Sequence, residues 1–454
     1  MTKARYIQLA NMLSSAIQEG KLAPGTKLPT HRAFAEQFSV ALATATRAYG
    51  ELERRGLIVG EAGRGTYVRD LGLPLTLGFR QTASDGLIDL VFNMPGDAAD
   101  ADMLRAGLRR IATAGDLEAM LRYQPHGGRM HERRIIAESF ISTLGTIDPE
   151  CLLVTSGGQH GLAIIVFGLF QRGDAIATDT LTYPGFKSVA ALQGLELVPV
   201  EGRGGAMDPD DLERQCRARK LRAVYLMPTV HNPLGAVMGE ATRLRLIEIA
   251  RKYDLLIIED AAYAFLEPDP PPSLVALAPE RTIHVGSFSK SLATGLRLGY
   301  IIAAPIYTDR LLEAIRATTW NAPALISGLV IGWIEDGTLA ASENSRRLDG
   351  MERQQLCRSA LTETAILSHR NAGFAWLPLK KGVRADPIVS RLKEQGISVS
   401  GAEPFATTVA VPQALRLAFG GVPKKGLQEI LQIVRDAVEW ASLAGIPPAD
   451  NLRS

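Results

Sequence analysis

The run Gly286-Ser-Phe-Ser-Lys290, with Gly295-Leu-Arg297-Leu-Gly-Tyr shortly behind it, is the most informative part of this 454-residue sequence. The first run follows Ile283-His284-Val285, and the second leads into the largely apolar residues 298–302, so both adjoin short predicted strands. Upstream, Ile257-Ile-Glu-Asp260-Ala-Ala-Tyr263 also ends a predicted strand. Because ligands gather at the carboxyl ends of parallel strands, we expect these segments to converge on one site.

Outside this stretch, short apolar runs alternate with helical patterns from residue 88 onward. The strands predicted in this way are residues 152–154, 175–177, 195–200, 223–226, 255–258, 283–285 and 298–302, and residues 241–252 form one of the intervening helices. The alternation predicts an α/β fold with a mainly parallel sheet sandwiched by helices. We expect a large subdomain at about residues 120–325. A smaller C-terminal α+β subdomain would comprise residues 88–119 and 326–454.

The polar residues at these strand ends have the chemistry that pyridoxal 5'-phosphate requires. Lys290 would form a Schiff base with the cofactor, and Asp260 would keep its ring nitrogen protonated. Asn232 and Tyr263 would hydrogen-bond its phenolic oxygen, and Tyr183 would stack on the ring. The phosphate would be bound by Ser287, Arg297 and the strand-to-helix turn at Gly158 and Gln159.

Residues 1–70 predict a separate unit of three short helices and a β-hairpin. Tyr6, Leu9, Leu13 and Ile17 recur at helical spacing, two further helices are predicted at residues 31–37 and 42–55, and β-prone runs flank Gly63-Arg64-Gly65. This order is that of a winged helix-turn-helix. The unit holds ten Lys and Arg against six acids, a net charge of +4, whereas the other 40 basic and 42 acidic residues give −2. A basic head on a near-neutral body favours DNA binding.

The start of the helix at 42–55 is where we expect contacts with double-stranded DNA, because the second helix of such a motif enters the major groove. Arg32, on the supporting helix, would contact a phosphate or a base, and Arg64 would enter the minor groove from the tip of the wing. The candidate DNA contacts are Arg32, Leu42, Thr44, Thr46, Arg47 and Arg64. Residues 71–87 show no clear periodicity and are predicted to be a short linker.

Both halves resemble known families. Lys21-Leu-Ala-Pro-Gly-Thr-Lys-Leu-Pro-Thr, Arg47-Ala-Tyr-Gly-Glu-Leu and Gly63-Arg-Gly-Thr-Tyr-Val resemble the head of GntR regulators, and residues 88–440 resemble fold type I aminotransferases. The combination resembles the MocR subgroup of the GntR family. Leu42 departs from the pattern, because many members have an arginine there. A leucine can touch a thymine methyl group but cannot bind guanine bidentately.

The resemblance implies further roles. Tyr123 would reach the cofactor phosphate of a partner subunit, which implies a homodimer, and Arg416 would bind the α-carboxylate of the substrate. Lys290, Asp260 and Tyr263 would be the catalytic set. The expected function is a transcription regulator that senses an amino acid or related amine by aldimine exchange at Lys290. Three alternatives stay open: an active aminotransferase with an accessory DNA-binding head, a sensor of pyridoxal phosphate itself, and a DNA-binding protein with an inert scaffold.

Composition bounds the location of the protein. The longest apolar run, residues 161–170, is shorter than a membrane span, and the N-terminus has no apolar signal core. The cysteines, Cys151, Cys216 and Cys357, lie far apart without metal-binding spacing, so we expect no metal site. The sequence predicts a cytoplasmic protein without a membrane partner.

Overall fold

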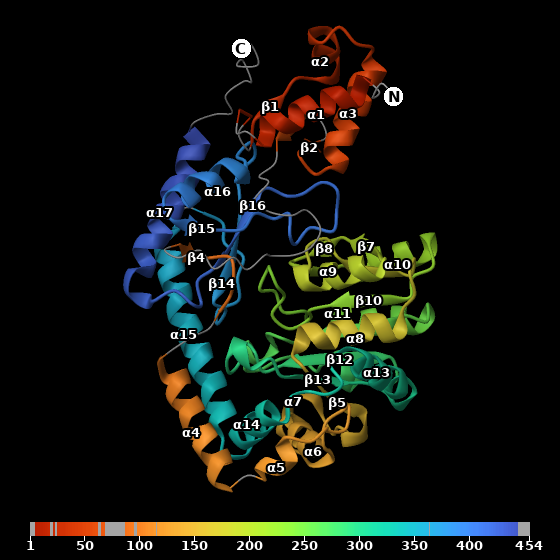
Figure 1. Ribbon diagram of the computed structural model, residues 1–454, viewed down its shortest axis with the longest axis vertical. Coiled ribbons are helices and arrows are strands. Elements are labelled where there is room, and N and C mark those ends of the chain that lie inside the picture. The colour runs from red at the N-terminus through yellow and green to blue at the C-terminus, as the bar shows by residue number, and fades with distance from the viewer. Residues whose placement is uncertain are drawn as a thin grey trace.

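The computed structural model describes residues 5–18, 21–22, 25–61, 65–68, 87–94, 98–114, 116–362 and 364–443. Arg64 and nearly all of the predicted linker lie outside these ranges. The N-terminal head contains α1 (Arg5–Gln18), β1 (Lys27–Leu28), α2 (His31–Gln37), α3 (Leu42–Arg54), β2 (Ile58–Glu61) and β3 (Gly65–Val68). Figure 1 shows this head at one end of the molecule, next to the small subdomain.

The head folds as the sequence predicts, around a small apolar core. Thr30 caps α2 by accepting a hydrogen bond from the Ala33 N–H, and Phe34 and Tyr49 pack edge-to-face with ring centres 5.1 Å apart. The strand β3 pairs antiparallel with both β2 and β1. We did not predict β1, because two residues show no alternation and become a strand only when β3 supplies a partner.

The large subdomain is built on a seven-stranded sheet in the order β5-β13-β12-β11-β10-β6-β7. Its strands are β5 (Leu152–Thr155), β6 (Ala175–Asp179), β7 (Glu196–Val200), β10 (Ala223–Leu226), β11 (Leu256–Asp260), β12 (Thr282–Ser287) and β13 (Gly299–Ile302). β13 runs antiparallel to its two neighbours, and the other pairings are parallel. The mainly parallel sheet is therefore confirmed.

Helices cover both faces of this sheet, as the apolar strands require. One face packs against α8 (Gly158–Leu169), α9 (Pro184–Gln193) and α13 (Pro305–Thr318). The other packs against α10 (Pro209–Ala218), α11 (Glu240–Lys252) and α12 (Leu274–Leu277), and, over β5 and β13, α6 (Met130–Ser139) and α14 (Ala324–Glu335). The shorter elements are α5 (Leu117–Met120), α7 (Ile141–Leu144), β8 (Gly202–Arg203), β9 (Ala206–Met207) and the 3-10 turns Pro149–Cys151, Ala264–Leu266 and Thr294–Leu296.

The small subdomain has its own apolar core. It contains β4 (Ile88–Asp89), β14 (Phe374–Pro378), α16 (Ala385–Glu394), β15 (Ile397–Ser398), β16 (Ala414–Ala418) and α17 (Lys424–Leu443). The long helix α15 (Thr338–Ala360) runs from α14 into this subdomain (Figure 1). Among the described helices, none alone is long and apolar enough to cross a bilayer. The pair α14 and α15, which is bent by 80°, is long and apolar enough when the two helices are taken together.

The boundary between the subdomains crosses α15. Leu339, near its start, lies in the core under β5 and β13, whereas Cys357, near its end, lies in the core of the small subdomain. Ile111 of α4 (Ala98–Ala114) also belongs to the first of these cores. The division expected at residues 119 and 326 would separate α4 and α14 from that core, so we propose a boundary within α15 instead.

Candidate functional site

A cavity of about 630 Å³ lies where the large and small subdomains meet, and it gathers most of the residues that the sequence singled out. Ten of the eleven predicted pocket residues line it: Gly158, Gln159, Tyr183, Asn232, Asp260, Tyr263, Ser287, Lys290, Arg297 and Arg416. Tyr123 lies elsewhere, with 86% of its surface exposed and its ring centre 5.6 Å from that of Trp320. An exposed tyrosine outside the pocket of its own chain is compatible with the expected contact to a partner.

Asp260 is the buried acid of the pocket. It ends β11, accepts a hydrogen bond from the Tyr225 hydroxyl at 2.7 Å and another from the Ala262 N–H at 3.0 Å. Burial raises the pKa of Asp260, although both hydrogen bonds favour the ionised form. A positively charged ring nitrogen beside this carboxyl group would offset the cost of burying its charge.

Lys290 and Tyr263 lie beside each other in the pocket. The Lys290 Nζ donates to the Asn93 carbonyl at 2.6 Å and lies 5.9 Å from the centre of the Tyr263 ring. The Asn93 amide donates to the Tyr263 hydroxyl at 3.3 Å. Burial acts to raise the pKa of Tyr263, but the positive charges of Lys290 and Arg416 outweigh it, so this pKa lies below its ordinary value. The Tyr263 oxygen is thus disposed to accept hydrogen bonds.

Hydrogen-bond donors cluster at the start of α8. Gly157, the residue before this helix, has φ of +92°, and a Cβ there would lie 3.1 Å from an Arg297 guanidinium nitrogen. Arg297 donates to the Ser289 hydroxyl at 3.4 Å, and the Ser289 N–H donates to the Ser287 hydroxyl at 3.2 Å. A helix N-terminus beside an arginine and two serines is suited to binding a phosphate group.

Arg416 is a buried cation in the lining of the same cavity. It lies in the middle of β16, is 3% exposed, and donates to the Val91 carbonyl at 2.8 Å. Its guanidinium carbon lies 5.0 Å from the centre of the Phe374 ring, and burial lowers its pKa. A buried guanidinium among apolar rings needs an anionic partner to offset its desolvation. A carboxylate is the partner that its planar fork fits.

The unsatisfied polar atoms test whether pyridoxal phosphate fits this pocket. Among the described residues, Asn232 Oδ1, Gln159 Oε1 and Arg416 Nε are buried without a hydrogen-bond partner. Such atoms cost stability unless a ligand satisfies them. The phosphate donors, the buried acid and the lysine also match the cofactor group by group, so the residues fit it.

Sequence reasoning missed three residues of the pocket. Asn93 holds both Lys290 and Tyr263, Tyr225 donates to Asp260, and Ser289 accepts from Arg297. The spacing Ser-x-Ser-Lys could have suggested Ser289. Tyr225 reads as an ordinary residue of a buried strand, and Asn93 lies almost 200 residues from Lys290, so neither had a local signal.

The predicted DNA contacts of α3 lie on its exposed side. Leu42 is 46% exposed, Thr46 and Arg47 are exposed, and Thr44 is half-buried, whereas Arg32 is exposed on α2. Leu42 and Thr46 are one helical turn apart and share a face. Arg54 and Arg55 at the far end of α3 pair instead with Glu51, at 2.5 and 2.7 Å. Arg64 lies outside the described residues.

Comparison with known proteins matches both halves. Residues 86–434 match the family aminotransferase class I and II, and residues 5–68 match the bacterial regulatory proteins of the gntR family. The uncharacterised HTH-type transcriptional regulator YdeF of Bacillus subtilis is 30% identical over 95% of this chain and 93% of its own. The probable rhizopine catabolism regulatory protein MocR of Rhizobium meliloti is 26% identical over 98% of this chain and 96% of its own. The chain belongs to the MocR subgroup of the GntR family of transcription regulators.

This MocR-type regulator has an aminotransferase-like body of known fold. The crystal structure of LysN, the alpha-aminoadipate aminotransferase of Thermus thermophilus, is 25% identical and superimposes with a TM-score of 0.73 over 79% of this chain and 93% of its own. That enzyme was solved in complex with N-(5'-phosphopyridoxyl)-L-leucine. Membership in the aminotransferase class I and II family implies pyridoxal phosphate as the cofactor, and the gntR head implies DNA binding.

Proposed function

We propose that this MocR-type regulator holds pyridoxal 5'-phosphate in the 630 Å³ pocket and senses there a small molecule with a primary amine and a carboxylate, an amino acid. When bound, the cofactor supplies an aldehyde that condenses reversibly with primary amines. Lys290 would provide the resident amine, which the amine of the sensed molecule would replace. The regulator would act as a homodimer on operator DNA, in the cytoplasm where that DNA lies.

The cofactor would be held by residues from several strand ends. Asp260 would pair with its ring nitrogen, Asn232 and Tyr263 would hydrogen-bond its phenolic oxygen, and Tyr183 would cover its ring. The phosphate would lie against Gly158, Gln159, Ser287 and Arg297, with Tyr123 of a second copy completing the site. Ser289 would orient Arg297 through the hydrogen bond at 3.4 Å.

The observation that carries the choice of ligand is the state of Arg416. Its guanidinium lines the same cavity as Lys290, is buried, and leaves Nε without a partner among the described residues. An amine that lacks a carboxylate would leave the charge of Arg416 without an anionic partner. A ligand that carries a carboxylate would neutralise this charge. The pocket therefore selects an amine that also carries a carboxylate.

A short chain of contacts connects Arg416 with the DNA-binding head. Gln413 directly precedes β16, and its side-chain oxygen accepts a hydrogen bond from the Ala385 N–H at 2.9 Å. The neighbouring residue, Arg384, contacts Tyr67 of the head. A ligand that displaces β16 would therefore change the position of the head relative to the small subdomain. Such a change is what coupling between the ligand site and the DNA-binding site requires.

The test is a DNA-binding titration of the full chain on a fragment from upstream of its own gene, followed by fluorescence anisotropy. With pyridoxal phosphate present, one amino acid from a panel is expected to change DNA affinity, and Lys290→Ala is expected to abolish that change. Borohydride reduction followed by peptide mass analysis should place a pyridoxyl group on Lys290. If neither cofactor nor amino acid changes DNA affinity, the sensing function is wrong.

The same preparation separates sensing from catalysis. Steady transfer of the amino group to a keto acid at more than roughly 1 s⁻¹, near the low end for enzymes, would favour the aminotransferase alternative. A change in DNA affinity on adding pyridoxal phosphate alone would favour a sensor of the cofactor. The proposed function expects neither outcome.

A further inference from the structure

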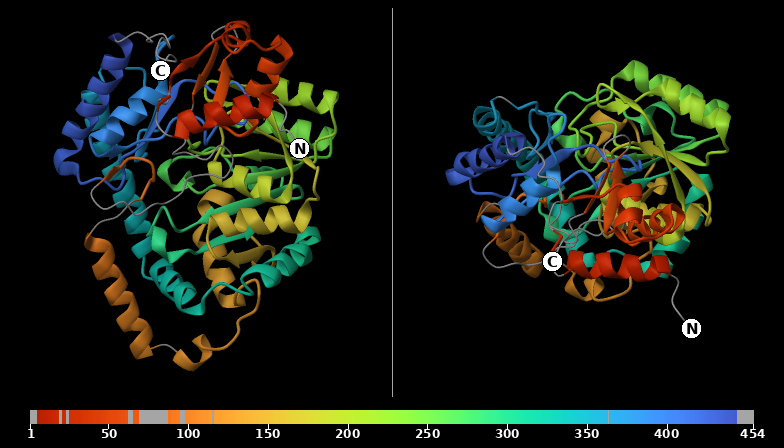
Figure 2. Two further views of the ribbon diagram at one scale, coloured as in Figure 1. Left: turned by 45° about the horizontal axis from the view of Figure 1, so that its top comes forward. Right: turned by 90° about the horizontal axis from the view of Figure 1, so that it is seen from above.

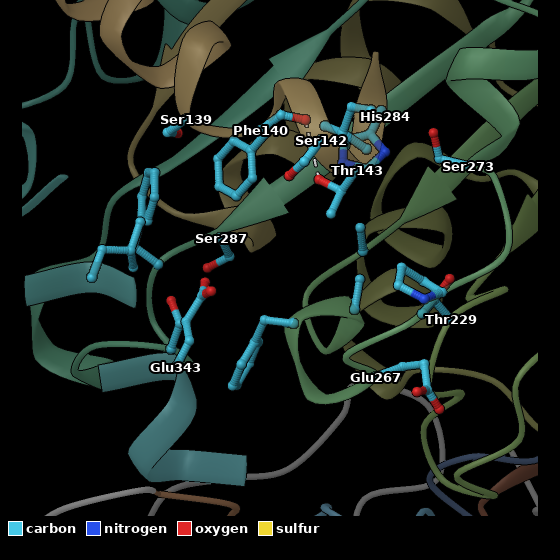
Figure 3. A pocket seen from close by; sticks show the side chains of 18 of the residues that line it. Ser139, Phe140, Ser142, Thr143, Thr229, Glu267, Ser273, His284, Ser287 and Glu343 are labelled. Atoms are coloured by element: carbon cyan, nitrogen blue, oxygen red, sulfur yellow. Dashed lines mark hydrogen bonds between the residues drawn. The ribbon is translucent and has the colours of Figure 1, made fainter. Parts of the chain in front are cut away.

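A second cavity, of about 700 Å³, adjoins the cofactor pocket and shares Asp260 with it. Residues of α6, α7 and α15 and of the segment 264–273 that follows β11 line it, together with residues of β11 and β12. Figure 3 shows this cavity with the carboxylate of Glu343 turned into the space bordered by Phe140, Ser287 and His284. None of the predicted roles of the chain uses this space.

The lining of the second cavity is strongly acidic. Its acids are Glu138, Glu259, Asp260, Glu267, Glu335 and Glu343, against Arg347 and His284 as basic residues. Such an excess of carboxylates around one cavity creates a negative potential that attracts cations and repels anions. The second cavity thus differs in charge from the cofactor pocket, whose lining includes the basic residues Lys290, Arg297 and Arg416.

Most of the inner carboxylates already have partners. Glu259 accepts hydrogen bonds from the Leu274 and Val275 N–H groups at 2.9 and 3.1 Å and contacts His284 at 2.9 Å. Glu267 contacts His369 at 3.1 Å. These pairs are part of the fold and leave little capacity for a ligand.

Glu343 is different. It is half-buried on α15, and within the described ranges it has neither a hydrogen bond nor an ion pair. Arg347, one turn further along α15, donates to the Phe265 carbonyl at 2.8 Å. A carboxylate that faces a cavity without a partner is costly, and a cationic ligand is what would remove the cost.

Aromatic rings supply the rest of a cation site. Phe140 stacks with Tyr300 at a centre-to-centre distance of 5.1 Å, Phe288 lies 5.7 Å from Tyr300, and all three line the cavity with Phe265. The faces of such rings attract cations, most strongly where water is excluded. A carboxylate opposite an aromatic wall is the arrangement that binds an ammonium group attached to an apolar body.

We propose that this cavity is a second ligand site of the regulator, which binds a small organic cation with Glu343 as its anionic anchor. Asp260 and Ser287 line both cavities, so an occupant here lies next to the cofactor pocket. A positive charge at this position acts on the Asp260 carboxylate. The site does not depend on the proposed cofactor, because its anchor and its aromatic wall lie outside the cofactor pocket.

The experiment uses benzyltrimethylammonium as the probe, because a quaternary ammonium cannot condense with an aldehyde and so cannot react with the cofactor in place of Lys290. Its affinity for the full chain is measured by isothermal titration calorimetry at pH 8. Glu343→Gln, which keeps the shape and removes the charge, is expected to weaken binding by at least about tenfold. Glu335→Gln, which removes an exposed carboxylate at the rim, is expected to leave affinity within about twofold.

Three results would overturn the proposal. The first is the absence of saturable binding up to roughly 10 mM probe, and the second is binding that persists unchanged in Glu343→Gln. The third is equal weakening by both substitutions, which would indicate general attraction of the probe to an acidic surface. Thermal unfolding of each variant establishes that it is folded. Binding by the wild-type chain that only Glu343→Gln impairs would support the proposal, whether or not the chain senses an amino acid.

Discussion

The guanidinium carbon of Arg384 lies 3.9 Å from the centre of the Tyr67 ring, so a cation–π pair joins the small subdomain to the DNA-binding head. Both residues are buried, at 6% and 3% exposure. Arg384 also donates to Asp386 at 2.8 Å, which fixes its position at the start of α16. Gly25 of the head lies against Pro387 in the same contact, where a Cβ would approach to 2.9 Å. The views in Figure 2 show the head seated at this end of the molecule.

Arg384→Met is expected to uncouple ligand binding from DNA binding. Methionine keeps much of the apolar packing but removes a desolvated cation–π contact of about 2 kcal/mol. DNA affinity should then no longer respond to the amino acid, as measured by anisotropy with and without ligand. Arg391→Met is the matched control, because Arg391 lies 4.6 Å from the centre of the Trp440 ring within the small subdomain. An equal effect of both substitutions would argue against a specific path through Tyr67.

Arg416→Gln is expected to weaken amino acid binding by roughly 100-fold, because truncating one partner of a buried charge pair costs about 2–5 kcal/mol. The measurement is a titration that follows the absorbance of the bound cofactor. The decarboxylated amine of the same side chain serves as the control, and its affinity should change little. If both ligands lose affinity equally, Arg416 acts through the structure of the pocket and does not bind a carboxylate.

Gly157→Ala is expected to lower the affinity for pyridoxal phosphate by about tenfold, since the new Cβ would push on Arg297. Gly173→Ala separates this effect from backbone strain. Gly173 has a similar φ of +89°, but a Cβ there meets nothing within 4 Å. Both variants should lose about 1 kcal/mol of stability, and only the first should bind cofactor poorly. Equilibrium dialysis of the cofactor and thermal unfolding measure the two quantities.

Arg47→Gln is expected to weaken DNA binding and to reduce the slope of log affinity against log salt by about 1, as the loss of one phosphate contact does. Arg54→Gln is the control on the same helix, because Arg54 is paired with Glu51 at 2.5 Å. Its salt slope should equal that of the wild-type chain. An unchanged slope for Arg47→Gln would remove this residue from the DNA contacts.

Glu343→Gln is expected to make the stability of the protein less dependent on pH. Burial raises the pKa of Glu343 to about 7, so the folded state favours the protonated acid more than the unfolded state does. The stabilisation from this group is complete below the unfolded pKa of about 4.5 and is lost as pH rises through about 7. The difference in Tm between Glu343→Gln and the wild-type chain should therefore increase from pH 5 to pH 8.

The other titratable and charged groups around this cavity are the same in both proteins, so the comparison isolates the change at Glu343. They are Glu138, Glu259, Asp260, Glu267, His284, Tyr300, Glu335 and Arg347. Glu335→Gln, which removes an exposed carboxylate from the lining of the same cavity, is the matched control variant. A flat difference for Glu343→Gln would show that its carboxylate is not desolvated.

Local patterns were sufficient to predict the helices of the head and the strands of the large sheet. The helix at residues 31–37 was predicted with its observed bounds, because Thr30 is a strong cap and Pro29 precedes it. The strands of the large sheet were predicted within one or two residues, since each is a short apolar run bounded by turns. The antiparallel direction of β13 was not predicted, because strand direction is set by the connections and not by the strand sequence.

The site was predictable where a residue type in a motif identifies its chemistry, and not where the role arises from contact alone. Lys290, Asp260 and Arg297 belong to motifs at strand ends. Asn93 acquires its role only when folding brings it to Lys290. Arg384 and Tyr67 belong to no sequence motif that predicts their contact across more than 300 residues. Glu343 reads as an ordinary charged residue on a long helix.

Asp260 forms part of the wall between two chambers, and that position has a consequence for gene control. If both chambers are filled in the cell, each occupant becomes part of the environment of the other. Thermodynamic reciprocity then requires that the factor by which the cation changes the affinity for the amino acid equals the factor by which the amino acid changes the affinity for the cation. If that coupling is not zero, the occupancy of the operator DNA depends on the concentrations of both metabolites, and neither concentration alone determines the output of the promoter.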